Sequence, residues 1–82
     1  MISVELEPIY IAANVREADF VERVLDDEGI EFNQRLEAFQ FESSSACFQG
    51  VLFEVLAGQA DYCRRLLAEK GLTRGVMPSP NT

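Results

Sequence analysis

The residue types that most often carry out catalysis or bind metals are sparse in this chain of 82 residues. It contains no histidine, which removes the usual proton shuttle near neutral pH and the commonest metal ligand. Its two cysteines, Cys47 and Cys63, have no cysteine or histidine neighbours at the spacing of zinc ligands. We therefore expect no catalytic centre, no metal site and no cofactor, and predict that the protein is not an enzyme.

The remaining candidates for chemistry are two thiols and one acidic cluster. Cys63 falls on the apolar face of a predicted helix, which indicates a small buried residue. Cys47 falls at the start of a predicted strand, where it could be reachable, but nothing near it in the sequence would lower its pKa. Four carboxylates at the end of the first predicted helix oppose the helix dipole, which favours a solvated surface over a cation site. They are Asp26, Asp27, Glu28 and Glu31.

The elements that would position these groups come from a strand–helix unit that the chain uses twice. Residues 18–30 and 60–72 align without gaps, 42 positions apart, and the same offset places the apolar run 9–11 on 51–53. In each copy apolar residues recur at helical spacing, and a glycine, Gly29 or Gly71, stands where the helix should stop. Helices are predicted at residues 15–28 and 59–70.

Polar residues mark the helix starts and the helix surfaces. Asn14 is placed to cap the first helix, and Glu17 occupies the capping-box position three residues later. Both copies carry an aspartate and an arginine four residues apart, which predicts a weak surface ion pair in each helix. These pairs are Asp19 with Arg23 and Asp61 with Arg65.

Four strands are predicted around the helices, at residues 9–13, at 30–36, from 47 or 48 to 55 or 56, and at 72–77. The order strand-helix-strand, used twice, predicts an α+β fold of the ferredoxin-like βαββαβ type. In that fold a four-stranded antiparallel sheet carries two helices on one face. Residues 1–77 would form this single domain, and residues 78–82 a flexible C-terminal tail.

The charge and the ends of the chain bear on partners and location. The net charge of −7 and the pI of about 4.4 repel nucleic acid and anionic membrane surfaces, so neither is an expected partner. The first residues lack the features of a secretory signal, and the longest uncharged run is far too short to cross a bilayer. The sequence therefore predicts a cytoplasmic protein.

Two surfaces remain as candidate sites. Tyr10, Ala12 and Leu52 are expected to share the sheet face away from the helices, an apolar strip that either lies exposed or is covered by the sheet of a second copy in a homodimer. The second surface is the connection from Leu36 to Ser45, expected to be more mobile than its surroundings. Its residues Leu36, Phe39 and Phe41 would either anchor a protein partner or fold back over the sheet edge.

Residues 48–53 resemble part of the acylphosphatase signature, whose phosphate loop belongs to the same fold. That family has an arginine two residues before the glutamine, where this chain has Cys47, and another after the phenylalanine, where it has Glu54. Without these cations a phosphate has no electrostatic support. We therefore exclude this activity.

The order of elements is indicated mainly by Ile9 to Ile11, residues 18–30 and residues 51–72. This order resembles that of the bacterial family of putative signal-transducing proteins. This is a domain of unknown function whose fold is similar to the nitrogen regulator PII. The resemblance implies a PII-like or ACT-like ferredoxin fold and a regulatory role without defined chemistry. Members commonly carry a proline in the second strand, where this chain has residues 31–33, and no functional residue is carried over.

Two functions are consistent with these patterns. The first is a non-enzymatic regulatory or interaction module of the signal-transduction type, which acts through self-association and a mobile central loop. The alternative is a small-molecule sensor that binds its ligand at a subunit junction.

Overall fold

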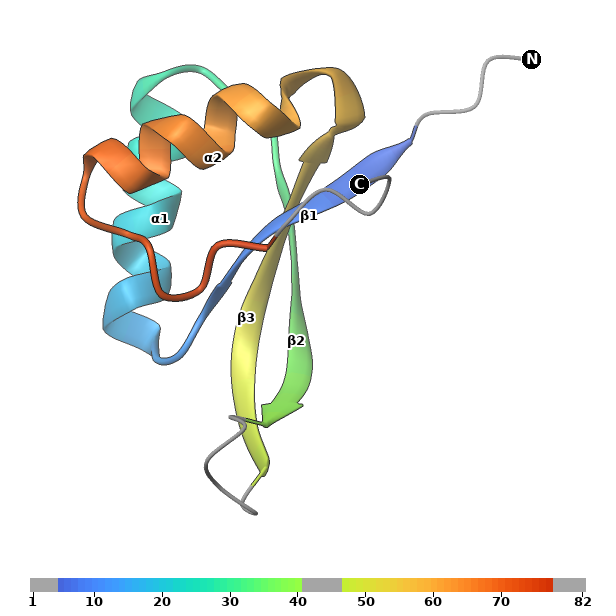
Figure 1. The fold of residues 1–82 in the computed structure, drawn as a ribbon, viewed down its shortest axis with the longest axis vertical. Coiled ribbons are helices and arrows are strands. Elements are labelled where there is room, and N and C mark those ends of the chain that lie inside the picture. Colours follow the sequence, from blue (N-terminus) through green and yellow to red (C-terminus); the bar gives the residue numbers. More distant parts are fainter. Residues whose placement is uncertain (1–4, 41–46, 78–82) are drawn as a thin grey trace.

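The computed structural model describes residues 5–40 and 47–77. Within these ranges the order is β1 (Leu6–Ala12), α1 (Val15–Asp27), β2 (Asn33–Gln40), β3 (Cys47–Leu56), a 3-10 turn (Ala57–Gln59) and α2 (Ala60–Glu69). The three strands form an antiparallel sheet in the order β1-β3-β2. The two helices pack beside each other against this sheet (Figure 1). The described part of the chain is therefore an α+β fold, as predicted.

Helix α1 begins at the predicted cap. The side-chain oxygen of Asn14 accepts a hydrogen bond of 2.8 Å from the Glu17 N–H. The Glu17 carboxylate reaches back as expected, but the N–H that it accepts from belongs to Ala13, at 3.3 Å. Both ends of this short connection between β1 and α1 are thus fixed by side chains.

Both helices end at the predicted glycine. Gly29 and Gly71 have φ angles of +71° and +87°, in the left-handed region that side chains rarely adopt. In each case the N–H of the following residue donates to the carbonyl five residues earlier, which is the Schellman pattern. These bonds are Ile30 to Leu25 at 3.0 Å and Leu72 to Leu67 at 2.9 Å. The sequence repeat therefore reflects two helices with the same ending.

The core lies between the two helices and the strands β1 and β3. The apolar residues that recur at helical spacing form the buried faces of the two helices, whereas Phe20 and Tyr62 are 44% and 49% exposed. The buried ones are Ala18, Val21, Val24, Leu25, Ala60, Cys63, Leu66 and Leu67. Cys63 is a free cysteine in the centre of this core, as predicted. The other large fully buried side chains are Ile9, Tyr10, Val21, Leu25, Phe53, Val55 and Leu67.

A bulge in β1 overturns one prediction about the sheet faces. The register between β1 and β3 shifts between Pro8 and Tyr10, so that Ile9 is an extra residue and both Ile9 and Tyr10 are buried. Tyr10 and Ala12 belong to the core, with 1% and 0% exposure. The prediction that they lie on the open face of the sheet was wrong, because the bulge turns Tyr10 toward the helices.

The hairpin of β2 and β3 overturns part of a second prediction. Residues 37–40, expected in a mobile connection, continue β2 and pair with β3 in unbroken register from Asn33 to Gln40. The far end of the hairpin extends beyond the helices (Figure 1). The rest of the predicted connection, residues 41–45, lies outside the described residues.

The C-terminal segment runs along the other edge of β1. The strand predicted at residues 72–77 is reduced to an isolated antiparallel bridge between Tyr10 and Val76. Two backbone hydrogen bonds of 2.9 Å flank this bridge, from Ile11 N–H to the Gly75 carbonyl and from Met77 N–H to the Ile9 carbonyl. The predicted flexible tail at residues 78–82 lies outside the described part of the chain.

Arg64 fastens this segment to the sheet. Its guanidinium donates to a Glu7 carboxylate oxygen at 2.6 Å, to Asp61 at 2.9 Å and to the carbonyl oxygens of Pro8 and Met77. The side chains of Arg64 and Glu7 are only 11% and 12% exposed. Among the described residues neither Asp19–Arg23 nor Asp61–Arg65 forms the predicted ion pair. In the second case Asp61 pairs with Arg64 instead, one position before Arg65.

Candidate functional site

The strand β2 carries the most exposed large apolar side chain of the described sheet. Leu36 is 68% exposed, and its register partner Val51 is only partly buried at the rim of the core. Gln34 and Ala38 lie on the same face as Leu36, because side chains alternate along a strand, and both are exposed. This face of β2 is on the helix side of the sheet, yet the described part of the helix layer does not cover it.

The opposite face of β2 carries charges of both signs. Arg35 and Glu37 are two residues apart and flank Leu36. The Arg35 Nε atom lies 3.6 Å from a Glu54 carboxylate oxygen and 3.8 Å from a Glu37 oxygen. Glu54 also accepts a hydrogen bond of 3.2 Å from the Asn33 amide. Arg35 and Glu37 keep about half of their side-chain surface exposed, so both remain open to a further partner.

The outer edge of β2 is open in the described structure. This strand lies at the end of the sheet order and pairs with β3 alone, so alternate backbone N–H and C=O groups point outward. Natural proteins usually blunt such edges with charged side chains, above all lysine, with proline or with a bulge. The residues of β2 include neither lysine nor proline, and their register with β3 has no irregularity. We define Asn33 to Ala38, with this free backbone edge, as the β2 edge surface.

The structure places the candidate site residues predicted from the sequence in different parts of the fold. Leu36 lies at the centre of the β2 edge surface, but on a strand rather than on a loop. The backbone of Phe39 belongs to β2, but its side chain is outside the described structure. Phe41 lies wholly outside the described residues. Leu52 is 4% exposed on the face opposite the helices, where its register partners are Ile11 and Arg35.

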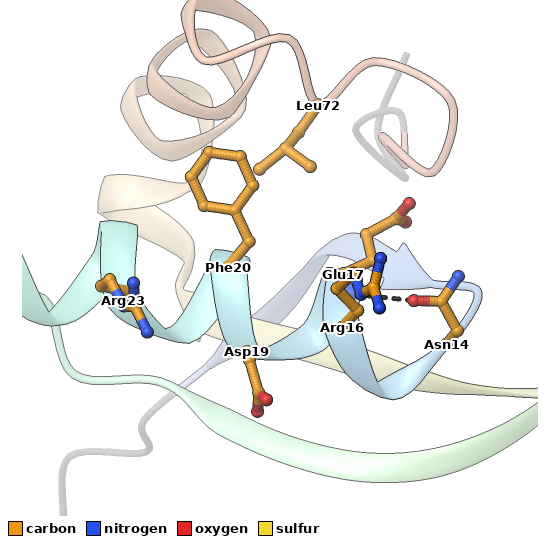
Figure 2. A pocket seen from close by; sticks show the side chains of 7 residues that line it. All are labelled: Asn14, Arg16, Glu17, Asp19, Phe20, Arg23 and Leu72. Carbon is orange, nitrogen blue, oxygen red and sulfur yellow. Dashed lines mark hydrogen bonds between the residues drawn. The ribbon is translucent and has the colours of Figure 1, made fainter.

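A shallow depression on α1 is the second candidate site. It has a volume of about 560 Å³ and is lined by Phe20, Leu72 and the exposed side chains of Arg16 and Arg23, with Asn14, Glu17 and Asp19 around them. Figure 2 shows Phe20 and Leu72 facing each other, while Arg16, Glu17 and Asn14 lie at the other end of the hollow. The depression therefore combines an apolar wall with two guanidinium groups.

The titratable groups with shifted pKa values are held in their neutral forms. Burial, reinforced by the hydrogen bond of 2.9 Å to Glu17, raises the pKa of Tyr10 to about 12. A hydrogen bond of 2.6 Å to Glu28 raises the pKa of the exposed Tyr62 phenol. Burial raises the pKa of the Cys63 thiol, which keeps it protonated and therefore a weak nucleophile. The two tyrosines thus serve as hydrogen-bond donors, and Cys63 serves as a packed core residue.

Within residues 5–40 and 47–77 no three cysteine, aspartate or glutamate side chains are arranged to hold a metal ion. In the same ranges no helix has both the length and the apolar character needed to cross a membrane.

A scan against protein-family models, a search of curated proteins and a search of solved structures each found no match to this chain.

Sequence reasoning missed two groups of residues. The triplet Arg35, Leu36 and Glu37 has the alternation of a strand with a charged face, and this signal would have extended β2 past Leu36. Arg64 gave no comparable signal. It is adjacent to Arg65 in the sequence, and only the packing of α2 on β1 distinguishes the buried arginine from the exposed one.

Proposed function

We propose that this protein is a non-enzymatic interaction module that binds another protein strand along the β2 edge surface. One observation carries the proposal: β2 is an edge strand without lysine, proline or a bulge, and it exposes Leu36 on one face and an Arg35/Glu37 pair on the other. In strand addition the backbone edge supplies the hydrogen bonds and the alternating side chains supply the specificity. The β2 edge surface has both.

The physical cost of leaving this edge open supports the proposal. An open edge with an exposed leucine is a template for pairing with other chains and is a liability unless pairing is its purpose. Leu36 also contributes little to the core, since most of its surface remains in solvent. Its apolar side chain therefore stays available to a partner strand.

The experiment places a photoactivatable amino acid at position 36, in the cells that make the protein. The matched control carries the same amino acid in place of Val15, which is 73% exposed at the start of α1 and lies outside the β2 edge surface. We expect discrete protein adducts from position 36 and none from position 15. Equal adducts from both positions, or none from position 36, would refute the proposed function.

The finer description of the fold belongs to the same proposal. The bridge between Tyr10 and Val76 extends the sheet order to C-terminal segment, β1, β3, β2, which is the order of a ferredoxin-like βαββαβ fold. A regulatory role of the PII-like signal-transducing type, in the cytoplasm, is the biological setting that we propose with this fold. The resemblance in sequence described above is its support.

The depression on α1 favours a second candidate function, a small-molecule sensor. Its lining combines an apolar wall with two guanidinium groups and the carboxylates of Glu17 and Asp19, which matches a zwitterionic compound with a small apolar part. A thermal-shift screen tests this, because a ligand at 100 times its Kd adds about 2.7 kcal/mol to the free energy of unfolding. A ligand of this site should lose its shift in Arg23→Ala but not in the control Arg65→Ala. A panel of nucleotides and amino acids without any shift would eliminate this function.

A further inference from the structure

We infer that the strand that occupies the β2 edge surface is β2 of a second copy of this chain, in antiparallel register centred on Leu36. This inference rests on the proposed function and names its partner. The resulting dimer would have one continuous sheet in which the described strands run β1-β3-β2-β2-β3-β1. Its two-fold axis would pass through the pair of Leu36 residues, perpendicular to the sheet.

The charges of β2 are complementary to themselves in this register. In an antiparallel pair centred on Leu36, Arg35 of each copy lies directly opposite Glu37 of the other. Residues directly opposite in antiparallel strands point to the same face, with Cβ atoms only about 5 Å apart. Both Arg–Glu pairs therefore form on the face away from the helices. The guanidinium of Arg35, now 3.6 and 3.8 Å from its two carboxylates, gains a third acidic neighbour.

The neighbouring registers lack this complementarity. A two-fold axis perpendicular to the sheet requires that a residue lie opposite itself, because a slip by one residue would exchange the faces. Centring on Arg35 places two guanidinium groups in contact, and centring on Glu37 does the same with two carboxylates. Like charges directly opposite destabilise a strand pair. Among these three centres only Leu36 pairs opposite charges.

The helix-side face of β2 fits the same register. Leu36 lies opposite Leu36 of the second copy, and Gln34 lies opposite Ala38 of that copy. The exposed leucine, which is 68% accessible in one copy, thus finds an apolar neighbour across the axis, beside the partly buried Val51. Since the axis is perpendicular to the sheet, the helices of both copies lie on the same side. The helices then flank the new apolar strip and do not block the approach of the second copy.

The test exchanges the two charges, separately and together, and measures molecular mass by sedimentation equilibrium from roughly micromolar to roughly millimolar protein. The wild-type chain should form a dimer within this range. Arg35→Glu and Glu37→Arg each place like charges opposite each other twice, and each should weaken the dimer about tenfold or more. The double variant restores two opposite-charge pairs and should dimerise like the wild type. An equimolar mixture of the two single variants should form a heterodimer, because one chain is acidic and the other basic at both positions.

The mixture also controls for folding, since a single variant that failed to fold could not be rescued by the other. Arg65→Glu, an exposed change of the same charge on α2, should leave the wild-type dimer intact. The inference is overturned if the wild-type chain remains monomeric at every concentration. It is also overturned if the double variant and the mixture remain as monomeric as the single variants. Adducts from position 36 to a different protein, together with a monomeric wild type, would overturn this inference and leave the proposed function standing.

Discussion

Tyr10 donates a hydrogen bond of 2.9 Å to the carboxylate of Glu17, and this contact joins the buried centre of β1 to the first turn of α1. The same carboxylate accepts the N–H of Ala13, so one side chain holds both sides of the β1–α1 connection. Because the bulge at Ile9 turns Tyr10 inward, its phenol reaches Glu17 from the core. The bulge therefore accounts for the burial of Tyr10, and the Glu17 carboxylate connects that buried residue to the first turn of α1.

The first prediction concerns stability at alkaline pH. Burial and the bond to Glu17 raise the pKa of Tyr10 from 10.0 to about 12 in the folded chain. As the pH rises, the Tyr10 phenol therefore loses its proton in the unfolded chain before it does so in the folded chain. The contribution of Tyr10 to the free energy of unfolding is complete below pH 10 and is lost as the pH rises toward 12. The difference corresponds to about 2–3 kcal/mol of unfolding free energy.

Urea unfolding across this pH range, in the wild type and in Tyr10→Phe, measures the effect. The variant should be less stable by about 1 kcal/mol at neutral pH, because it lacks the hydrogen bond, and should show a flatter decline above pH 10. Tyr62→Phe is the control, since the Tyr62 phenol is exposed and its loss removes less. A decline that is equally steep in Tyr10→Phe would show that another group is responsible.

The second prediction concerns the buried arginine. Arg64→Met removes the four hydrogen bonds to Glu7, Pro8, Asp61 and Met77 and leaves the Glu7 carboxylate nearly buried without its partner. We expect a loss of about 3 kcal/mol in unfolding free energy, measured by urea denaturation. The neighbouring Arg65→Met, at an exposed position, should change it by less than about 0.5 kcal/mol. Similar losses in both variants would contradict the role assigned to Arg64.

The third prediction concerns the approach of the C-terminal segment to β1. A Cβ atom on Gly75 would collide with the Ile11 carbonyl oxygen and would lie 2.9 Å from the Tyr10 ring. Gly75→Ala should therefore push residues 75–77 away from β1 and cost about 1–3 kcal/mol. Gly58→Ala is the matched control, because nothing lies within 4 Å of its Cβ position. Amide exchange at Ile11, whose N–H donates to Gly75, should accelerate in the first variant only.

The parts of the fold that local physics determines could be read from the sequence. The apolar stripes of both helices, the Asn14 cap of α1 and the stops at Gly29 and Gly71 depend on contacts within a few residues, and the repeat reports the stripes and the stops twice. The faces of the sheet could not be read in this way. The bulge at Ile9 depends on the register of β1 against β3, which is set by residues more than 40 positions away.

The candidate site was only partly accessible from the sequence for the same reason. Leu36 is predicted at the end of the second strand, in a connection that either anchors a protein partner or folds back over the sheet edge, because Glu37, Ala38 and Gln40 have weak strand propensity. Their pairing with β3 overrides that propensity and creates the open edge. The choice between Arg64 and Arg65 likewise depends on tertiary packing, since either arginine lies close enough to Asp61 along the helix to pair with it.

Hydrogen exchange of the β2 amides as a function of protein concentration measures strand pairing at the β2 edge surface most directly. An edge strand exchanges its outward N–H groups rapidly when it is free and slowly when another strand pairs with it. We predict that outward-pointing amides within residues 33–38 become protected as the protein concentration rises, while exchange in α1 and α2 does not change. Rates at β2 that stay constant over the whole range, or protection that appears on the helices instead, would contradict this prediction.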